Sequence, residues 1–567
     1  MSLTKVTYSM IADAAANVVD FGADRTGVNS ANTAITAAIA SLPTDGGTVF
    51  FPAGTYSISA VLGVTKSNIK LVGEPGSVIE ITGANIHNAF EFTACTNIFI
   101  TGLRFEWNGA ALNTSNPGWE NNYALSFKPD PVTFASCNNV TIQNCYFNEC
   151  ASMVTWYISG AQQTAIAADA NKRYYNFIFA NNTINATLNS GSYAALDATY
   201  LDRYEITGNL FQSGPVAYSG IRQTGSASVG GGLQYSSKGR IVNNQFIGSR
   251  WGLYIGAANN ILIADNVLDG QASEGIDFEG CTDCIADSNK LSNQKFAFGL
   301  FYYYKNIKIS NNHVNLTDDA SYFLNHSPTG VTTGYGDLVV SDNWVQCVGG
   351  SVYFQLQNGQ HINIKNNEFR NVVYTATSNF YSLEMSNNTW IWDRTNPSAA
   401  SWLILPADLN TSYQAGYFRI TNNEFIATTP LAINCISLYA NQSFANEFYI
   451  MNNLFMNVAY PVNYDSAAPN RANNRTLFFD NVIEGETAPY SIGGGAATPQ
   501  FIFRGLINRS GLSVFDDPTD FGTLIGSGGC GLGSTFNRNP PASGQVWGWV
   551  NTSNTGAPTW TAISTLP

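Results

Sequence analysis

The chain is poor in charged residues and contains no long apolar run. Only 11% of its 567 residues are Asp, Glu, Lys or Arg, and the net charge is −13. Because Lys and Arg never cluster and an acidic surface repels phosphate backbones, we expect no nucleic-acid partner. No apolar run approaches the ~20 residues of a membrane span, so we expect no membrane insertion. The first residues lack an apolar signal core, so Sec-type export is not indicated.

Histidine and cysteine do not indicate a metal site. The four histidines share no metal-ligand spacing. The nine cysteines are an odd number spread from Cys95 to Cys530, which is typical of a chain made in a reducing cytoplasm. Cys281 and Cys284 match a redox or zinc spacing, but no second pair or histidine lies near them in sequence, so we expect two small residues inside a coil. We therefore predict no metal and no cofactor.

What the sequence has instead is a column of asparagines. Twelve times a short apolar strand pattern is followed by an Asn that leads into the next apolar residue, and a thirteenth copy has Cys145 in the Asn position. Successive Asn residues are 22, 23 and 23 positions apart between Asn244 and Asn312, and insertions of variable size separate the others. The column consists of Asn182, Asn209, Asn244, Asn266, Asn289, Asn312, Asn343, Asn367, Asn388, Asn423, Asn453 and Asn481.

This repeat is too short for a propeller blade and lacks helical periodicity. A parallel β-helix fits it, because each coil lays short strands on the preceding coil ~4.8 Å away and buries its apolar edge against its neighbours. We expect each Asn to adopt the left-handed backbone conformation at a corner and to hydrogen-bond the Asn one coil on. The alternative is a β-sandwich rich in Asn turns, which has no reason to keep one register through every copy.

Both ends of the chain differ from the coils. A short helix is expected before the first coil, with four apolar residues on one face (Ile35, Ala38, Ile39 and Leu42) and Pro43 at its end. Such a helix would cover the open edge of a solenoid. The predicted divisions are a lead segment (1–17), a capping region (18–60), the β-helix (61–487) and a small C-terminal β domain (488–567), whose role is trimerisation or, alternatively, carbohydrate binding.

The opening of the chain carries a family resemblance. It contains Asp20-Phe-Gly-Ala-Asp24, the helix, and Gly46-Gly-Thr-Val-Phe-Phe-Pro-Ala-Gly-Thr-Tyr56. With the coils behind it, this segment resembles pectate-lyase-like right-handed β-helices, and most closely bacteriophage tailspike proteins, over roughly residues 18–485. The resemblance implies an all-β, right-handed parallel β-helix that forms a homotrimer and binds, and usually cleaves, the capsule or lipopolysaccharide of the host. It also implies a virion protein, made in the host cytoplasm, that attaches to a phage tail or baseplate protein and acts at the host cell surface.

The densest acidic cluster on any predicted strand is Glu274-Gly-Ile-Asp277-Phe-Glu279. Counted back from the next Asn, Asp277 and Glu279 fall on one outward face, with Cα atoms roughly 6.5 to 7 Å apart. This spacing brackets the carboxyl separations of glycosidases, which are ~5 Å in retaining and ~6.5 to 9.5 Å in inverting enzymes. We predict that Asp277 and Glu279 are the catalytic acid and base, with Glu274 as a substitute for either. The alternative is that these acids only solvate an exposed strand.

Candidate sugar-binding residues follow from the same register. Tyr254 lies one coil before the acidic pair and Tyr302 one coil after it, and such rings stack on sugars. Asp197 shares the outward column three coils earlier, and Arg222 lies in a long insertion where it could meet an acidic sugar. The full set is Asp197, Arg222, Trp251, Tyr254, Tyr302 and His326.

The sequence therefore predicts a tailspike that depolymerises a bacterial surface polysaccharide by hydrolysis. Two alternatives stay open. A polysaccharide lyase would cleave by β-elimination beside a uronic acid, using Arg222, His326, Tyr254 or Tyr302. A non-catalytic adhesin would bind glycan on the same aromatic and polar face.

Overall fold

The computed structural model divides into two compact units, residues 1–290 and 291–567, each of which is described by itself. Among the described residues, none of the helices has the length and apolar character needed to cross a bilayer. The described residues are 15–82, 88–107, 123–149, 152–156, 165, 169–186, 194–197, 201–213, 219–223, 236–317, 321–327, 336–348, 350–356, 359–376, 380–394, 401–405, 417–428, 434–438, 447–458, 460–464, 475–484, 490–492, 500–504, 507–508, 535–537, 546–551 and 560–565.

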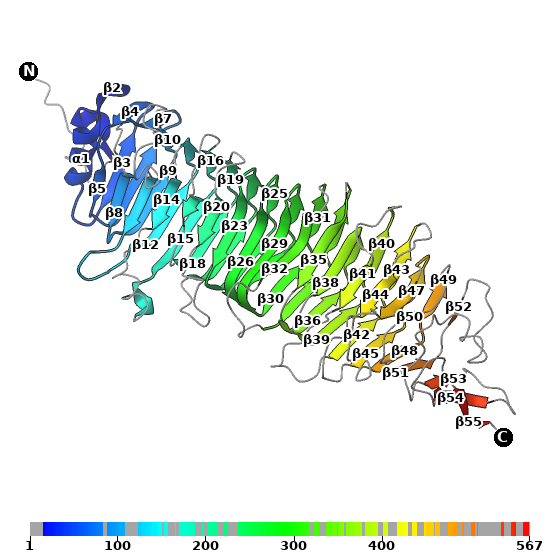
Figure 1. Cartoon of the computed structure of the whole chain (residues 1–567). Coiled ribbons are helices and arrows are strands. Elements are labelled where there is room, and N and C mark those ends of the chain that lie inside the picture. Colours follow the sequence, from blue (N-terminus) through cyan, green and yellow to red (C-terminus); the bar gives the residue numbers. More distant parts are fainter. Residues whose placement is uncertain are drawn as a thin grey trace, which may run out of the picture. The chain divides into compact units, whose positions relative to one another are not determined.

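Each unit is a stack of coils, and each coil contributes three strands. One coil of the first unit consists of β22 (Gln245–Ile247), β23 (Trp251–Gly256) and β24 (Ala258–Ala264). These strands pair in parallel with β25 (Val267–Asp269), β26 (Glu274–Thr282) and β27 (Ile285–Asp287) of the next coil. Figure 1 shows this stacking of strand upon strand within each unit. The prediction of a right-handed parallel β-helix is confirmed.

The core lies inside the coils because alternate side chains of each strand point inward. In β23 and β26 the inward residues Leu253, Ile255, Ile276 and Phe278 are at most 1% exposed. Phenylalanine rings at equivalent positions of successive coils stack on one another, for example Phe211 on Phe246 with centroids 4.8 Å apart. Burial of this apolar interior against neighbouring coils is what stabilises a repeat that could not fold alone.

The asparagine ladder has the predicted hydrogen bonds. Within each unit the Nδ2 of one Asn donates to the Oδ1 of the Asn in the next coil, at 2.9 to 3.1 Å. The same Oδ1 accepts the backbone N–H of the preceding ladder residue, as Asn266 Oδ1 does from Asn244 at 2.9 Å. Cys145 occupies the first position, since its N–H donates to Asn182 Oδ1 at 2.9 Å. All the ladder side chains are buried.

The expected backbone conformation of the ladder was wrong by one residue. Positive φ angles occur at the residue that precedes each ladder position, for example Asn181 (54°), Asn243 (58°) and Asp265 (56°), and the ladder Asn residues are not among the positive-φ residues. The preceding side chain points to solvent at a corner where Asn, Asp and Gly tolerate the left-handed region. The ladder Asn therefore supplies hydrogen bonds, and the residue before it supplies the turn.

The predicted helix is α1 (Asn32–Ser41), which lies at the N-terminal end of the first unit (Figure 1). Its buried residues are Ala34, Ile35, Ala38 and Ile39, and Leu42 follows as the buried C-cap. Strand β3 (Gly47–Phe51) then pairs in parallel with β6 (Ile69–Gly73) and begins the coils.

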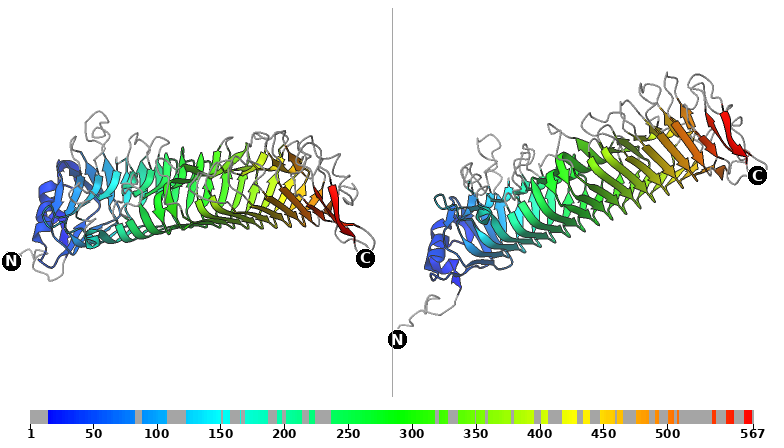
Figure 2. Two further views of the ribbon diagram at one scale, coloured as in Figure 1. Left: turned by 60° about the horizontal axis from the view of Figure 1, so that its bottom comes forward. Right: turned by 90° about the horizontal axis from the view of Figure 1, so that it is seen from below.

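In the second unit the parallel coils continue beyond residue 487, where the sequence analysis placed their limit. Strand β51 (Gln500–Arg504) pairs in parallel with β48 (Arg475–Phe479), and β52 (Ile507–Asn508) with β49 (Val482–Glu484). Strand β53 (Thr535–Asn537) pairs in parallel with β51 and antiparallel with β54 (Val546–Asn551), and β54 pairs antiparallel with β55 (Trp560–Thr565). The views in Figure 2 show the same coil-upon-coil order within the unit.

Candidate active site

Four of the predicted site residues share one column of the first unit. The parallel register places Asp197 of β17 (Ala194–Asp197) beside Arg222 of β20 (Ser219–Gln223), Arg222 beside Tyr254, and Tyr254 beside Asp277. Gly256 is the register partner of Glu279, so the preceding coil has no side chain at that position. The prediction that Asp197 lies in the Asp277 column three coils earlier is confirmed for the backbone. The side chains of Asp197 and Arg222 lie outside the described residues.

Asp277 is buried although it is on the outward face of its strand. It alternates with the core residues Ile276 and Phe278, so its side chain points away from the interior, yet only 1% of it is exposed. Its Oδ1 has no hydrogen-bond partner. Burial raises the pKa of this carboxyl well above its usual value, and the nearby charges of Glu279 and Glu274 raise it further. The expectation of an exposed pair is therefore wrong for Asp277, and the reading that it merely solvates the strand does not fit its burial.

Glu279 is the more accessible carboxyl of the pair. It is half-buried, and the Tyr254 hydroxyl donates a 2.5 Å hydrogen bond to its Oε2. Burial raises the pKa of Glu279, the bond from Tyr254 opposes that rise, and the charge of Glu274 adds to it. A tyrosine that was expected to stack on sugar thus also binds a catalytic candidate directly.

Glu274 lies at the start of β26, beside a corner formed by Arg250 and Trp251. Glu274 is 5% exposed, and burial raises the pKa of its carboxyl. Hydrogen bonds from Ser273 and Trp251 and the charge of Arg250 lower the pKa, but burial outweighs them. The Arg250 guanidinium lies 4.2 Å from the Trp251 ring centroid. The Trp251 ring meets that of Tyr254 edge to face, with centroids 6.4 Å apart.

Arg250 was missed in the sequence. It is the exposed cation next to this carboxyl cluster. Arg250 immediately precedes Trp251, in the coil before Glu274. With the coil register known, this position could have indicated that Arg250 lies close to Glu274.

The remaining two candidates belong to the second unit. Tyr302, in β29 (Phe296–Lys305), has a φ of 60°, which is uncommon for an aromatic residue. His326, in β32 (Ser321–Ser327), is fully buried, with its ring 5.2 Å from that of Tyr304. Burial lowers the pKa of His326 to about 3. The expectation that His326 contacts substrate does not agree with this burial.

These groups can divide acid and base chemistry between them. Burial and the two neighbouring acids favour the protonated form of Asp277, whereas the Tyr254 hydroxyl favours the ionised form of Glu279. Carboxyls whose environments push their pKa values in different ways are the usual arrangement of an acid and a base at one site. Within the described part of the chain, no cluster of three or more His, Cys, Asp or Glu side chains is placed to hold a metal ion.

Comparison with known proteins agrees with the fold. Residues 15–234 match the family described as rhamnogalacturonase A/epimerase, pectate lyase-like, and residues 221–400 match a family described as periplasmic copper-binding protein NosD. A search of curated proteins found no match. The chain has a pectate-lyase-like parallel β-helix fold.

Solved structures with this kind of fold are similar to the chain only at low identity. The pre-mature gene product 12 of bacteriophage phi29 is 12% identical with a TM-score of 0.43, and the match covers 97% of this chain and 76% of that one. The adhesin PfbA of Streptococcus pneumoniae is 14% identical with a TM-score of 0.40, covering 70% and 100%. The catalytic unit of an α-1,3-glucanase from Streptomyces thermodiastaticus is 14% identical with a TM-score of 0.33, covering 89% and 70%.

Proposed function

We propose that this chain cleaves a polysaccharide by glycosidic hydrolysis at the carboxylate cluster of Glu274, Asp277 and Glu279. The observation that carries the proposal is the buried Asp277 carboxyl, whose Oδ1 has no hydrogen-bond partner and which lies in the field of two further acids. Such a group destabilises the fold at neutral pH. Strained and uncompensated groups of this kind are retained at functional sites more often than elsewhere.

In the proposed reaction Asp277 is the acid and Glu279 the base. Asp277 gives its proton to the glycosidic oxygen as the bond from that oxygen to the anomeric carbon breaks. A water molecule attacks the anomeric carbon, and Glu279 takes a proton from it. Tyr254 holds Glu279 in place and favours its ionised form. Because Asp277 is covered, the reaction requires that the glycan displaces the side chains above this carboxyl.

The surroundings of the cluster support a glycan as substrate. Trp251 and Tyr254 place two aromatic rings beside the carboxyls, and such rings offer a flat apolar face with a polar edge. Arg250 lies exposed at the same corner, and Arg222 is in the register column of Asp277. Arg250, the cation beside the cluster, favours a polysaccharide that contains an acidic sugar.

The resemblance of the opening segment to tailspikes supports a finer identity. We propose a phage tailspike that acts on the capsule or O-antigen of a host bacterium. In this proposal the chain assembles as a homotrimer on the virion and attaches to a tail or baseplate protein.

Incubation of the purified chain with capsular polysaccharides and O-antigens, followed by analysis of the fragments, tests the reaction. Hydrolysis gives new reducing ends without an ultraviolet-absorbing unsaturated sugar. Fragments with an unsaturated, ultraviolet-absorbing end would instead establish β-elimination. Retention of polysaccharide without fragments would establish an adhesin and reject the catalytic proposal.

A further inference from the structure

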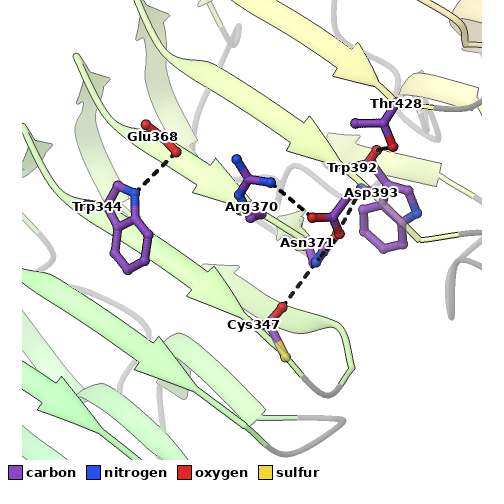
Figure 3. Close-up of polar contacts among 8 residues, drawn as sticks. All are labelled: Trp344, Cys347, Glu368, Arg370, Asn371, Trp392, Asp393 and Thr428. Atoms are coloured by element: carbon purple, nitrogen blue, oxygen red, sulfur yellow. Dashed lines mark hydrogen bonds and ion pairs between the residues drawn. The ribbon is translucent and has the colours of Figure 1, made fainter.

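A groove on the second unit presents aromatic and charged side chains together, and its residues play no part in the proposed cleavage. It has a volume of about 380 Å³ and lies over β34 (Trp344–Cys347) and β37 (Glu368–Arg370). Its lining includes Trp344, Glu368, Arg370 and Asp393 (Figure 3). The volume lies within the range of small-ligand sites.

The indole at one side of the groove is fixed on both its edge and its face. Trp344 Nε1 donates a 3.2 Å hydrogen bond to Glu368 Oε1 in the next coil. One face of the ring stacks on His313 of β31 (His313–Leu316), with centroids 4.2 Å apart and planes 16° from parallel. Trp344 and Glu368 are both on regular strands, so the indole ring and the Glu368 carboxylate are held in position before any ligand binds.

The opposite side of the groove is a network centred on Asp393. Arg370 Nη1 donates to Asp393 Oδ2 at 3.0 Å, and Asn371 Nδ2 donates to Asp393 Oδ1 at 2.7 Å. Asn371 also anchors the network to the coil before it, because the same Nδ2 donates to the Cys347 carbonyl at 3.0 Å. Burial alone would raise the pKa of Asp393, but the bonds from Asn371 and Arg370 outweigh it, and the pKa is lowered.

This arrangement holds Arg370 while leaving it in contact with solvent. Its side chain is 34% exposed, and a guanidinium has five N–H donors in a fixed fork. Asp393 neutralises its charge and Glu368 adds a negative one, so the three groups sum to one negative charge and disfavour an anionic ligand. Glu368 supplies acceptors, Arg370 supplies donors, and Trp344 supplies a ring surface.

We propose that this groove binds one or two uncharged pyranose units of a glycan. Ring hydroxyls would bridge Glu368 and Arg370 while the apolar side of the sugar contacts the indole. The inference goes beyond the proposed cleavage and does not depend on it, since a binding groove needs no catalytic acid. It gives the second unit a carbohydrate contact of its own.

The test is saturation-transfer NMR on the full chain with methyl glycosides of glucose, galactose, mannose and N-acetylglucosamine, and with glucuronate as an anionic probe. At least one neutral glycoside is expected to bind, and Trp344→Ala should weaken it by about 10-fold or more. Glu368→Gln keeps the shape of the groove and should also weaken binding, so the test survives if Trp344→Ala does not fold.

The matched control is Tyr146→Ala, which removes a partly exposed aromatic ring under Arg104 on β13 (Tyr146–Asn148) of the first unit. Binding should be unchanged in this variant and in Asp277→Asn. The proposal is overturned if no neutral glycoside binds, if only glucuronate binds, or if both groove variants bind normally. Loss of binding in Asp277→Asn would indicate that the sugar binds at the carboxylate cluster, and this result would also overturn the groove proposal.

Discussion

The Tyr254 hydroxyl lies 2.5 Å from Oε2 of Glu279, across one coil boundary of the first unit. This bond opposes the rise in pKa that burial causes at Glu279. The neighbouring Asp277 has no such bond to its Oδ1 and shares the same strand. The deeper burial of Asp277 and the tyrosine hydroxyl at Glu279 together give the two carboxyls of this strand different affinities for protons.

Removal of either proton-transfer group should abolish most cleavage. Asp277→Asn and Glu279→Gln keep the shape of the side chains, and each should lower the cleavage rate by about 100-fold or more, the lower bound of proton-transfer catalysis. Polysaccharide retention should survive in both variants. Asp265→Asn is the control, because Asp265 is an exposed corner residue where the preceding coil carries Asn243. If both variants digest polysaccharide at the original rate, the cluster is not the active site.

Tyr254→Phe should shift the pH dependence of cleavage. Without the hydroxyl, the pKa of Glu279 rises, and a base must be ionised to act, so the ascending limb of the rate profile should move to higher pH. Activity near neutral pH should fall, and it should recover in part at higher pH. Tyr146→Phe on β13 should leave the profile unchanged. A uniform loss of rate at every pH would assign Tyr254 a structural role only.

Asp277→Asn should stabilise the fold. A group whose folded-state pKa is raised contributes stability below its unfolded pKa and loses that contribution as the pH rises through the folded value. The wild-type chain therefore carries the penalty at neutral pH, and the amide removes it. We expect a gain of about 0.5 to 2 kcal/mol at pH 7, the range of single stabilising substitutions. The gain in melting temperature should shrink as the pH approaches 4, and an unchanged or lower stability at pH 7 contradicts the proposed protonation of Asp277.

The asparagine ladder should be essential to stability. Asn266→Leu removes the Oδ1 that accepts both the backbone N–H and the Nδ2 of Asn244, and the Nδ2 that donates to the Ile241 carbonyl. Each buried group left without a partner costs about 1 to 3 kcal/mol. Denaturation should therefore occur at markedly lower denaturant concentration. Gln245→Leu, a substitution of the exposed residue that follows the ladder residue Asn244, is the control and should change little.

The oligomeric state checks the tailspike proposal independently of catalysis. Light scattering should give a trimer of about three times the 61.2 kDa of one chain. Because parallel pairing continues to β53, which pairs with β51, shortening the chain after residue 537 removes the antiparallel strands β54 and β55 and keeps the parallel ones. This truncation should weaken the trimer, and a monomer at micromolar concentration would reject the prediction.

The repeat was readable from sequence because a β-helix is nearly one-dimensional. Each coil contacts mainly its neighbours, so the spacing of Asn182 to Asn481 determines which residues stack, and the parity of each strand determines which face they occupy. The same counting placed Asp197, Tyr254 and Asp277 in one column. It also found the capping helix from its apolar face.

Burial was decided by the tertiary structure. The alternation of side chains along the strand predicts that Asp277 points outward, but it does not predict what covers the side chain there. It therefore predicted an exposed acid where the structure has a buried one. The same limit applies to His326, which is buried. It applies to the groove as well, where Trp344 and Asp393 line one cavity from separate coils. Sequence determines the register of a solenoid because hydrogen bonding is local and periodic, whereas solvent access and pKa depend on side chains and loops that do not repeat.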